Sequence, residues 1–281
     1  GPRQNVTQTI SGHLSKMPVE LDGDNLVRYT LNIGDNPIAL NDFIGKSISL
    51  RFLGAINCLH CGRKSNKSFS QGYCYPCFKK LPQCDLCMMS PERCHYEAGT
   101  CRDPAWGESF CMSDHIVYLA KSSNPKVGIT RITQVPIRWI DQGAVEALPL
   151  FRVATRQQSG LLEDRLRQHV ADRTNWRAML KGEVADVELP QLAEKLKTLC
   201  ADDILTLQEQ FGVHAITPID GVSVQPIHYP VLEYPSKIKT FNFDKTELVE
   251  GTLMGIKGQY LLLDTGVINI RKFTSYQVAF T

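Results

Sequence analysis

Residues 58–77 read CLHCGRKSNKSFSQGYCYPC and contain two Cys-x2-Cys pairs separated by twelve residues. Each pair can form a tight knuckle that points two thiolates at one ion. Two knuckles complete a tetrahedral site with no open position, which is typical of structural zinc. The spacing therefore predicts one zinc site with the ligands Cys58, Cys61, Cys74 and Cys77.

Five further cysteines follow within the next 34 residues: Cys84, Cys87, Cys94, Cys101 and Cys111. The segment has few aliphatic residues, so metal must supply part of its folding energy. We expect a second structural zinc, with Cys84, Cys87, Cys94 and Cys101 favoured as ligands and Cys111 or His115 as the substitute. An iron–sulfur cluster is the alternative occupant, since four cysteines satisfy it equally well.

The composition of the 281 residues indicates a cytoplasmic protein. No run of ~20 apolar residues, the length that spans a bilayer, occurs in the chain. Clustered Cys-x2-Cys pairs favour metal binding in a reducing compartment over a disulfide framework. We therefore expect no membrane partner and a cytoplasmic location.

The net charge of +2 hides an uneven distribution. Residues 51–181 carry 19 Lys and Arg against 11 Asp and Glu, a balance of +8, whereas the flanks carry 12 against 18, a balance of −6. A basic middle between acidic ends indicates a polyanionic partner for the middle. Nucleic acid is the expected partner, with RNA preferred over DNA because zinc knuckles beside small barrels recur among RNA readers.

The pattern of turns and apolar residues divides the chain into four segments of an α+β protein. Residues 3–57 and 213–281 show short alternating stretches with Gly and Asp turns, and we expect a small β-barrel from each. Residues 58–115 form the double zinc module, and residues 116–212 an α/β core with additional helices. Cys200 lies on an apolar helical stripe with Leu196 and Ile204, so we interpret it as a core residue.

The pattern of apolar residues and turns in residues 116–181 predicts a strand, a strand, a helix, a strand and a helix, in that order. The hairpin would pair Ile116–Ala120 with Lys126–Thr130, the third strand would be Leu150–Ala154, and Ser159 would cap the last helix. The motifs Ile-Val-Tyr-Leu-Ala, Lys-Val-Gly-Ile-Thr, Arg138-Trp139 and Leu162-Glu163 follow this order. In residues 115–181 the chain resembles the GIY-YIG nuclease superfamily. The zinc knuckles followed by this block resemble a prokaryotic family of proteins of unknown function.

The resemblance implies a set of catalytic residues, each carried over by its place in the motifs. Tyr118 matches the tyrosine of the first motif, Gly128 the glycine of the second, Arg138 the helix arginine and Glu163 the ligand of one Mg2+ or Mn2+ ion. Asn175 is a weaker candidate for the polar residue that closes the site. The residues expected to bind nucleic acid are Lys126, Gly128, Arg131, Arg152 and Arg156.

We therefore expect a nucleic-acid-processing hydrolase, a metal-dependent endonuclease that acts on RNA or DNA. Two alternatives stay open. Ile116 and Lys126 stand where the two motifs have glycine and tyrosine, which favours a non-catalytic RNA- or ribosome-binding zinc protein. An iron–sulfur redox protein is the other alternative, and colour on purification would distinguish it.

Overall fold

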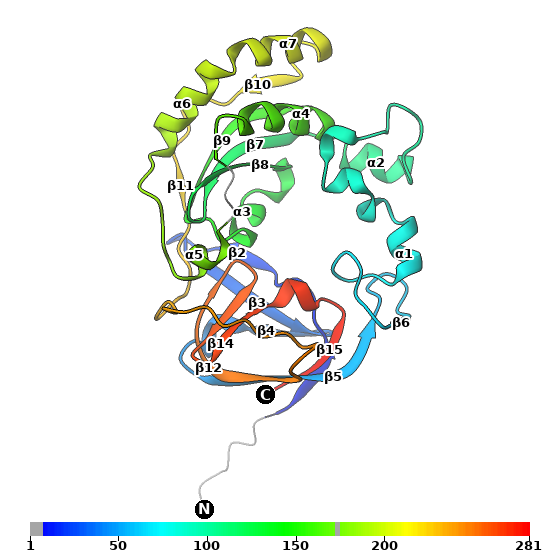
Figure 1. Ribbon diagram of the computed structural model, residues 1–281, viewed down its shortest axis with the longest axis vertical. Helices are drawn as coiled ribbons and strands as arrows, with labels where there is room; N and C mark the ends of the chain where they lie inside the picture. The colour runs from blue at the N-terminus through cyan, green and yellow to red at the C-terminus, as the bar shows by residue number, and fades with distance from the viewer. Residues whose placement is uncertain (1–7, 172–174) are drawn as a thin grey trace, which may run out of the picture. The chain divides into compact units, whose positions relative to one another are not determined.

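The computed structural model describes residues 8–171 and 175–281. The chain divides into two units, one formed by residues up to Phe78 together with His228–Thr281, the other by Lys79–Ile227. Both units mix strands and helices, so the expected α+β class is confirmed (Figure 1). Residues 3–7 of the expected first segment lie outside the described residues.

The first unit is organised by β5 (Ser47–Asn57), the longest strand of the sheet in which it lies. One neighbour of β5 is β15 (Tyr276–Phe280) and the other is β12 (Leu248–Lys257), and both pair with it antiparallel. The sheet order is β1-β15-β5-β12-β13-β14, and β6 also pairs with β5. The remaining bounds are β1 Ile10–His13, β6 Lys64–Ser65, β13 Tyr260–Leu263 and β14 Gly266–Asn269.

The expectation of two small β-barrels is wrong. Within residues 8–171 and 175–281 the sheets are open, and strands from both terminal segments meet in one sheet. The reason lies in the pairing of β5, which bonds to β12 and β15 from the far end of the sequence. Strand alternation shows which residues are half-buried but does not identify the neighbouring strand.

A three-stranded sheet, β2-β3-β4, belongs to the same unit. Its strands are β2 (Val19–Leu21), β3 (Val27–Ile33) and β4 (Asn36–Ala39). Strand β3 alternates buried and more exposed residues, the pattern of a strand with one face toward a core. The residue after β3, Gly34, lies very close to Gly12 of β1. A Cβ atom built on Gly12 would lie 2.5 Å from the backbone N of Gly34.

The second unit contains a five-stranded sheet of order β10-β9-β7-β8, with β11 also paired to β9. Every residue of β7 (His115–Lys121) is buried, which explains its nearly continuous apolar sequence. Its neighbours are β8 (Pro125–Arg131) and β9 (Glu146–Val153), both antiparallel. On the other side of β9 lie β10 (Ile216–Pro218) and β11 (Gln225–Pro226).

Helices follow the strands of the second unit in the expected order. Helix α3 (Ile137–Asp141) lies between β8 and β9, and α4 (Arg156–Arg167) follows β9. The expected cap of α4 at Ser159 is wrong, because Thr155 precedes the helix and its Oγ1 accepts a hydrogen bond of 3.2 Å from the N–H of Gln158. Helix α4 therefore begins four residues earlier than expected. The other helices are α1 Tyr75–Lys80, α2 Pro104–Phe110, α5 Trp176–Leu180, α6 Leu189–Leu199 and α7 Ala201–Phe211.

The core of the second unit lies between the sheet and α4, α6 and α7. Cys200 is fully buried in it together with Leu196 and Ile204, which confirms its interpretation as a core residue. The residue itself separates α6 from α7. Within the described part of the chain we find no helix with the length and apolar content to cross a bilayer.

The contact between Gly12 and Gly34 generates a prediction about the first unit. The substitution Gly12→Ala should reduce the free energy of unfolding by about 1–3 kcal/mol, because the new methyl group meets backbone that cannot rotate away. Urea unfolding measures the change. Gly23→Ala is the matched control, since a Cβ there meets nothing within 4 Å. Equal stability of the two variants would contradict the close approach.

Candidate metal centres and a candidate active site

The four cysteines of residues 58–77 converge on one point in the first unit. Cys58 directly follows β5, and Cys74 directly precedes α1. The four Sγ atoms lie within 4.8 Å of one another, and those of Cys61 and Cys74 are 3.7 Å apart. Tetrahedral zinc with bonds of ~2.3 Å separates its sulfurs by about 3.8 Å. The cluster can therefore hold a structural metal ion such as zinc.

The backbone of this cluster is arranged to stabilise a thiolate. Burial raises the pKa of Cys58, but backbone N–H groups of Cys61, Cys74 and His60 outweigh burial and lower the pKa to about 6. Burial and the neighbouring thiols raise the pKa of Cys77 to about 12. The crowded thiols thus accept one negative charge and resist further charge until a cation compensates it.

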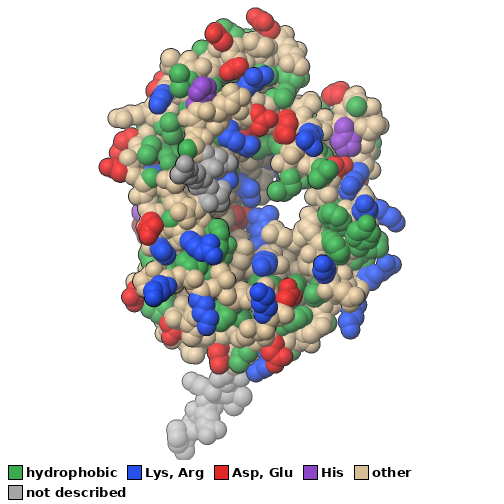
Figure 2. All heavy atoms as spheres, in the orientation of Figure 1, with side chains coloured by type: hydrophobic (Ala, Val, Ile, Leu, Met, Phe, Trp, Pro, Cys, Tyr) green, Lys and Arg blue, Asp and Glu red, His purple; other side chains and the backbone are tan. Residues whose placement is uncertain are grey.

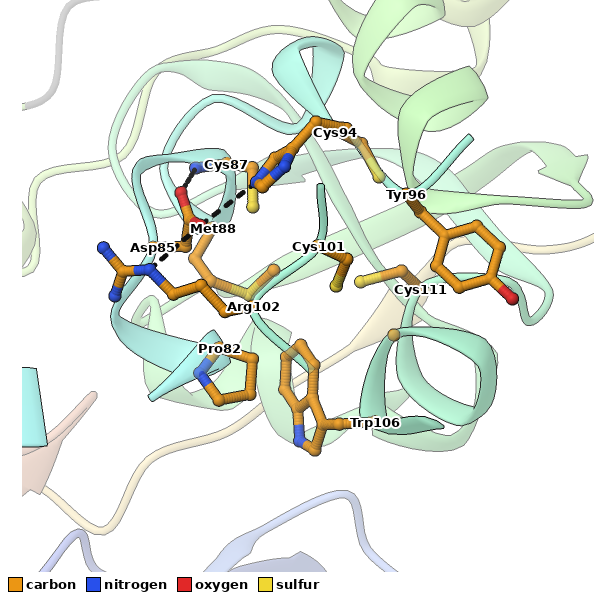
Figure 3. Close-up of a pocket in the computed structure, with 12 residues that line it drawn as sticks. Pro82, Asp85, Cys87, Met88, Cys94, Tyr96, Cys101, Arg102, Trp106 and Cys111 are labelled. Atoms are coloured by element: carbon orange, nitrogen blue, oxygen red, sulfur yellow. Dashed lines mark hydrogen bonds and ion pairs between the residues drawn. The ribbon is translucent and has the colours of Figure 1, made fainter. Parts of the chain in front are cut away.

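A second group of cysteines surrounds a small cavity in the second unit. Cys87 belongs to a short 3-10 helix (Leu86–Met88), Cys94 follows another (Pro91–Arg93), and Cys111 ends α2. Together with Cys101 they line a cavity of about 10 Å3. The sulfurs of Cys101 and Cys111 point toward one another, with those of Cys87 and Cys94 across the same space (Figure 3).

The thiols of this cavity influence one another. Burial raises the pKa of Cys87 to about 12, and Asp85, Cys94 and Cys111 raise it further. Burial likewise raises the pKa of Cys111 to about 11, with Cys94 and Cys101 acting in the same direction. The sequence favoured Cys84 over Cys111, yet Cys111 lines the cavity whereas Cys84 and His115 do not.

Asp85 and His95 stabilise the loop around this cavity. The Oδ2 of Asp85 lies 3.1 Å from Nε2 of His95 and 3.2 Å from Nε of Arg102. The Nδ1 of His95 lies 2.8 Å from Oγ1 of Thr100. Asp85, Cys87 and His95 also have ligand atoms within 4.8 Å of one another. Both ring nitrogens of His95 already have partners, so we interpret His95 as a support for the loop.

Tyr118 and Gly128 form the centre of the candidate active site in the second unit. They lie opposite each other in the β7–β8 pair. A Cβ built on Gly128 would lie 2.6 Å from the Tyr118 hydroxyl, so only glycine leaves room for this ring. The hydroxyl donates a hydrogen bond of 3.0 Å to Oε1 of Gln142, and the ring packs edge-on against Trp139.

Charged side chains from α3 and α4 lie around Tyr118. Burial raises the pKa of this completely buried tyrosine to about 12. Glu163 acts in the same direction as burial, and Arg138 opposes it. Burial also raises the pKa of Glu163, against the lowering effect of Arg167, Lys126 and Arg156. The Glu163 carboxylate forms an ion pair with Arg167, one helical turn further along α4.

Five residues expected from the sequence therefore lie near Tyr118 or belong to its surroundings. Gly128 faces the Tyr118 ring, and Arg138 and Glu163 shift the pKa of its hydroxyl. Lys126 and Arg156 lower the pKa of Glu163. Three others have separate local contacts. Arg131 stacks on the ring of Phe110 at 3.9 Å, and Arg152 forms an ion pair with Asp114. Asn175 caps α5, where its Oδ1 accepts a hydrogen bond of 3.0 Å from the N–H of Ala178.

Sequence reasoning missed Gln142 and Arg167. The position of Arg167 four residues after Glu163 is the usual spacing of a helical ion pair and could have identified it. Gln142 lies 24 residues from Tyr118, and no local pattern connects the two. The indole Nε1 of Trp139 is buried and has no hydrogen-bond partner among residues 8–171 and 175–281. It is a polar atom at this site that a ligand could satisfy.

The start of α4 connects the thiol cavity to the polar group around Tyr118. Arg156 donates from its backbone N to the carbonyl of Cys111 at 2.8 Å and from Nη2 to the carbonyl of Met88 at 2.7 Å. Gln157 donates from Nε2 to the carbonyl of Cys94 at 3.3 Å. The first turn of α4 therefore bonds to the loops of the second cluster, while Glu163 lies further along the same helix.

The geometry of the first cluster generates a prediction. Cys77→Ser should cost the protein about one zinc ion per chain, because a serine hydroxyl is a poor replacement for a thiolate ligand. Elemental analysis of the purified protein measures the loss. Cys200→Ser is the matched control, since Cys200 is a core residue, and it should keep the wild-type zinc content. An unchanged zinc content in Cys77→Ser would remove this cluster as a metal site.

Comparison with known proteins places the chain in a family. Residues 45–278 match the family described as "Protein of unknown function (DUF2797)". We found no match among curated proteins and none among solved structures. The matched region covers most of the chain, and it includes both cysteine clusters and the group around Tyr118. The expectation of a family of unknown function is therefore confirmed, and the protein belongs to the DUF2797 family.

Proposed function

We propose that the second unit contains a metal-dependent phosphodiesterase site that cuts nucleic acid. One observation carries the proposal: Arg138 of α3 and Glu163 of α4 lie close enough to Tyr118 of β7 to shift the pKa of its hydroxyl, Arg138 downward and Glu163 upward. The resemblance to GIY-YIG nucleases assigns catalytic roles to the same three residues. The balance of +8 in residues 51–181 supports a polyanionic substrate.

Arg138 would stabilise the phosphate as it gains negative charge. A guanidinium donates two parallel hydrogen bonds to phosphate oxygens, and such donors act most strongly in the transition state. Arg138 is half-buried on the short helix α3, so its position is restrained more than that of a surface arginine. Lys126, half-buried on β8, is the second cation of this group and would contact a neighbouring phosphate oxygen.

Tyr118 would act as a fixed hydrogen-bonding group. Because burial raises its pKa to about 12, the phenol keeps its proton at neutral pH and is a poor general base. Its hydroxyl already donates to Gln142. Because Tyr118 is buried, it would position Gln142 through this bond, and the half-buried Gln142 would contact the attacking water while the phenol keeps its proton.

Glu163 is the residue that would hold a divalent cation. The donor chemistry fits, because Mg2+ is often bound by one or two carboxylates together with waters and phosphate oxygens. The cation would supply charge neutralisation at the leaving oxygen. The Oε1 atom of Glu163 is paired with Arg167 in this structure, so a cation would bind at the other carboxylate oxygen or displace Arg167.

The thiols of Cys87, Cys94, Cys101 and Cys111 would bind a second structural zinc. All four line the same cavity, and the backbone that carries them has little apolar core of its own. Four thiolates satisfy an iron–sulfur cluster as well, and a coloured protein with stoichiometric iron would establish that alternative. The expected preference for RNA rested on small β-barrels that the described residues do not form, so the proposal covers RNA and DNA alike. The cytoplasm stays the expected location.

The rival function is a non-catalytic nucleic-acid binder. The ion pair between Glu163 and Arg167 favours it, because it occupies the carboxylate that a catalytic cation needs. Lys126 stands where nuclease motifs have a tyrosine and would bind phosphate without activating water. A binder of this kind would show no cleavage and no metal dependence.

The catalytic proposal predicts different failures for two variants. Arg138→Ala should reduce cleavage of pooled RNA and DNA by roughly a hundredfold or more while binding weakens little. Glu163→Gln should also lose activity and recover part of it at high Mn2+, because the amide keeps the shape but loses the anionic ligand. Cleavage is measured with Mg2+ or Mn2+ and compared with EDTA.

Arg165→Ala is the matched control for these variants, because Arg165 lies on α4 and forms a long ion pair with Asp203. It should cut at the wild-type rate. Wild-type protein that leaves every substrate intact with both metals would establish the binder. Cleavage that is equal in wild type, Arg138→Ala and Glu163→Gln would assign the activity to another site or to a contaminant.

The second metal centre predicts a contrast between two cysteines. Cys111→Ser should cost about one metal ion per chain, since Cys111 lines the cavity. Cys84→Ser should keep the wild-type metal content, because Cys84 is outside the lining. Elemental analysis of both variants decides between the ligand set of the structure and the one favoured by the sequence. Loss of metal only in Cys84→Ser would restore the latter.

A further inference from the structure

The first zinc cluster carries a group of three aromatic rings on its surface. Phe69 and Phe78 stack with their centroids 5.7 Å apart, and Tyr75 lies edge-on to Phe69 at 5.4 Å. Tyr75 and Phe78 are 6.4 Å apart, so each ring contacts the other two. We call Phe69, Tyr75 and Phe78 the aromatic platform.

The platform is held in place by the metal-binding backbone. Tyr75 lies between the ligands Cys74 and Cys77, and Phe78 directly follows Cys77. Phe69 belongs to a small hairpin in which it exchanges backbone hydrogen bonds of 2.7 and 2.9 Å with Tyr73. A closed zinc site and a hairpin therefore fix the rings before any ligand arrives, which lowers the entropic cost of binding.

The exposure of Tyr75 exceeds what packing alone requires. Tyr75 is 52% exposed, whereas Phe69 and Phe78 are partly buried. The two phenylalanines stack on each other and are partly buried. Tyr75 thus presents its ring to solvent on a rigid support.

Cations surround the platform, and acidic residues are absent from the whole stretch. Arg63, Lys64 and Lys67 are exposed, and α1 ends with the exposed pair Lys79 and Lys80. Residues 58–80 contain no Asp or Glu. Figure 2 shows a hydrophobic patch bordered by Lys and Arg on the face that carries α1 and β6. The charge of this surface complements a polyanion.

We propose that the aromatic platform binds unpaired bases of single-stranded nucleic acid. Aromatic rings stack on the face of any base, while nearby Lys and Arg contact the phosphate backbone. Paired bases are closed to such stacking, so duplexes should bind less well. The inference extends the proposed nucleic-acid function to a second place on the chain, separate from the group around Tyr118.

Binding of fluorescein-labelled single strands of 12 nucleotides, in RNA and DNA versions, tests the proposal on the zinc-loaded full chain. Tyr75→Ala should weaken single-strand binding roughly tenfold or more, because one base loses its stacking partner. Tyr75→Phe keeps the ring and should bind as the wild type does. The double variant Lys64→Gln/Lys67→Gln should reduce the slope of log affinity against log salt by about one unit or more.

Two controls match these variants in chemistry. Tyr234→Ala removes another partly exposed tyrosine, and Lys245→Gln removes an exposed lysine outside the stretch 58–80. Both should bind as the wild type does. Zinc content is measured for every variant, so that a loss of binding with zinc retained reports the surface and not unfolding.

The outcomes separate this inference from the proposed function. If Tyr75→Ala and the lysine double variant bind single strands as tightly as wild type, the platform is not a binding surface, whatever the cleavage assay shows. If wild-type protein binds no single strand of either kind, the inference fails as well. If the wild-type protein cuts nucleic acid but the platform variants bind single strands normally, the proposed function is supported and the aromatic platform is not.

Discussion

The mutual repulsion of closely spaced thiolates is the constraint on which the cysteine-rich stretch depends. Four Sγ atoms lie within 4.8 Å of one another around Cys58, in a segment with few aliphatic side chains. Backbone N–H groups stabilise one thiolate, but several anions at that distance repel each other unless a cation lies between them. A metal ion bound here would couple metal binding to the folding of this segment, and it would also hold the aromatic platform in place.

In the second unit, the buried cation Arg156 and the neighbouring cysteines depend on each other in a comparable way. Burial lowers the pKa of this guanidinium, and the nearby Cys111 and Cys87 oppose the shift. A tetrathiolate centre with a divalent ion carries a net charge of about −2, which would offset the buried cation. Because Arg156 begins α4 and Glu163 lies on that helix, the second centre would also fix the position of the candidate active site. The contacts of Arg156 and Gln157 connect the cysteine cavity to the start of the helix that carries Glu163.

The candidate active site differs in character from the metal centres. Its members are held by ordinary packing, with Gly128 leaving space for the ring of Tyr118 and Trp139 packed against the ring's edge. Its charges are balanced internally by the pair of Glu163 and Arg167. In the proposed nuclease, a cation and a phosphate would compete with this internal ion pair, whereas the rival binder would leave the pair intact.

The sequence alone determined the features whose chemistry is local. The two Cys-x2-Cys pairs identified the first cluster because a knuckle closes within a few residues, and the β7–β8 hairpin follows from two apolar stretches joined by a turn. Only the tertiary structure decided that β5 pairs with β12 and β15, that Cys111 lines the second cavity, and that Gln142 bonds to Tyr118. These contacts join residues far apart in the chain, and the spacing of residues along a sequence carries little information about which distant partner packing will select.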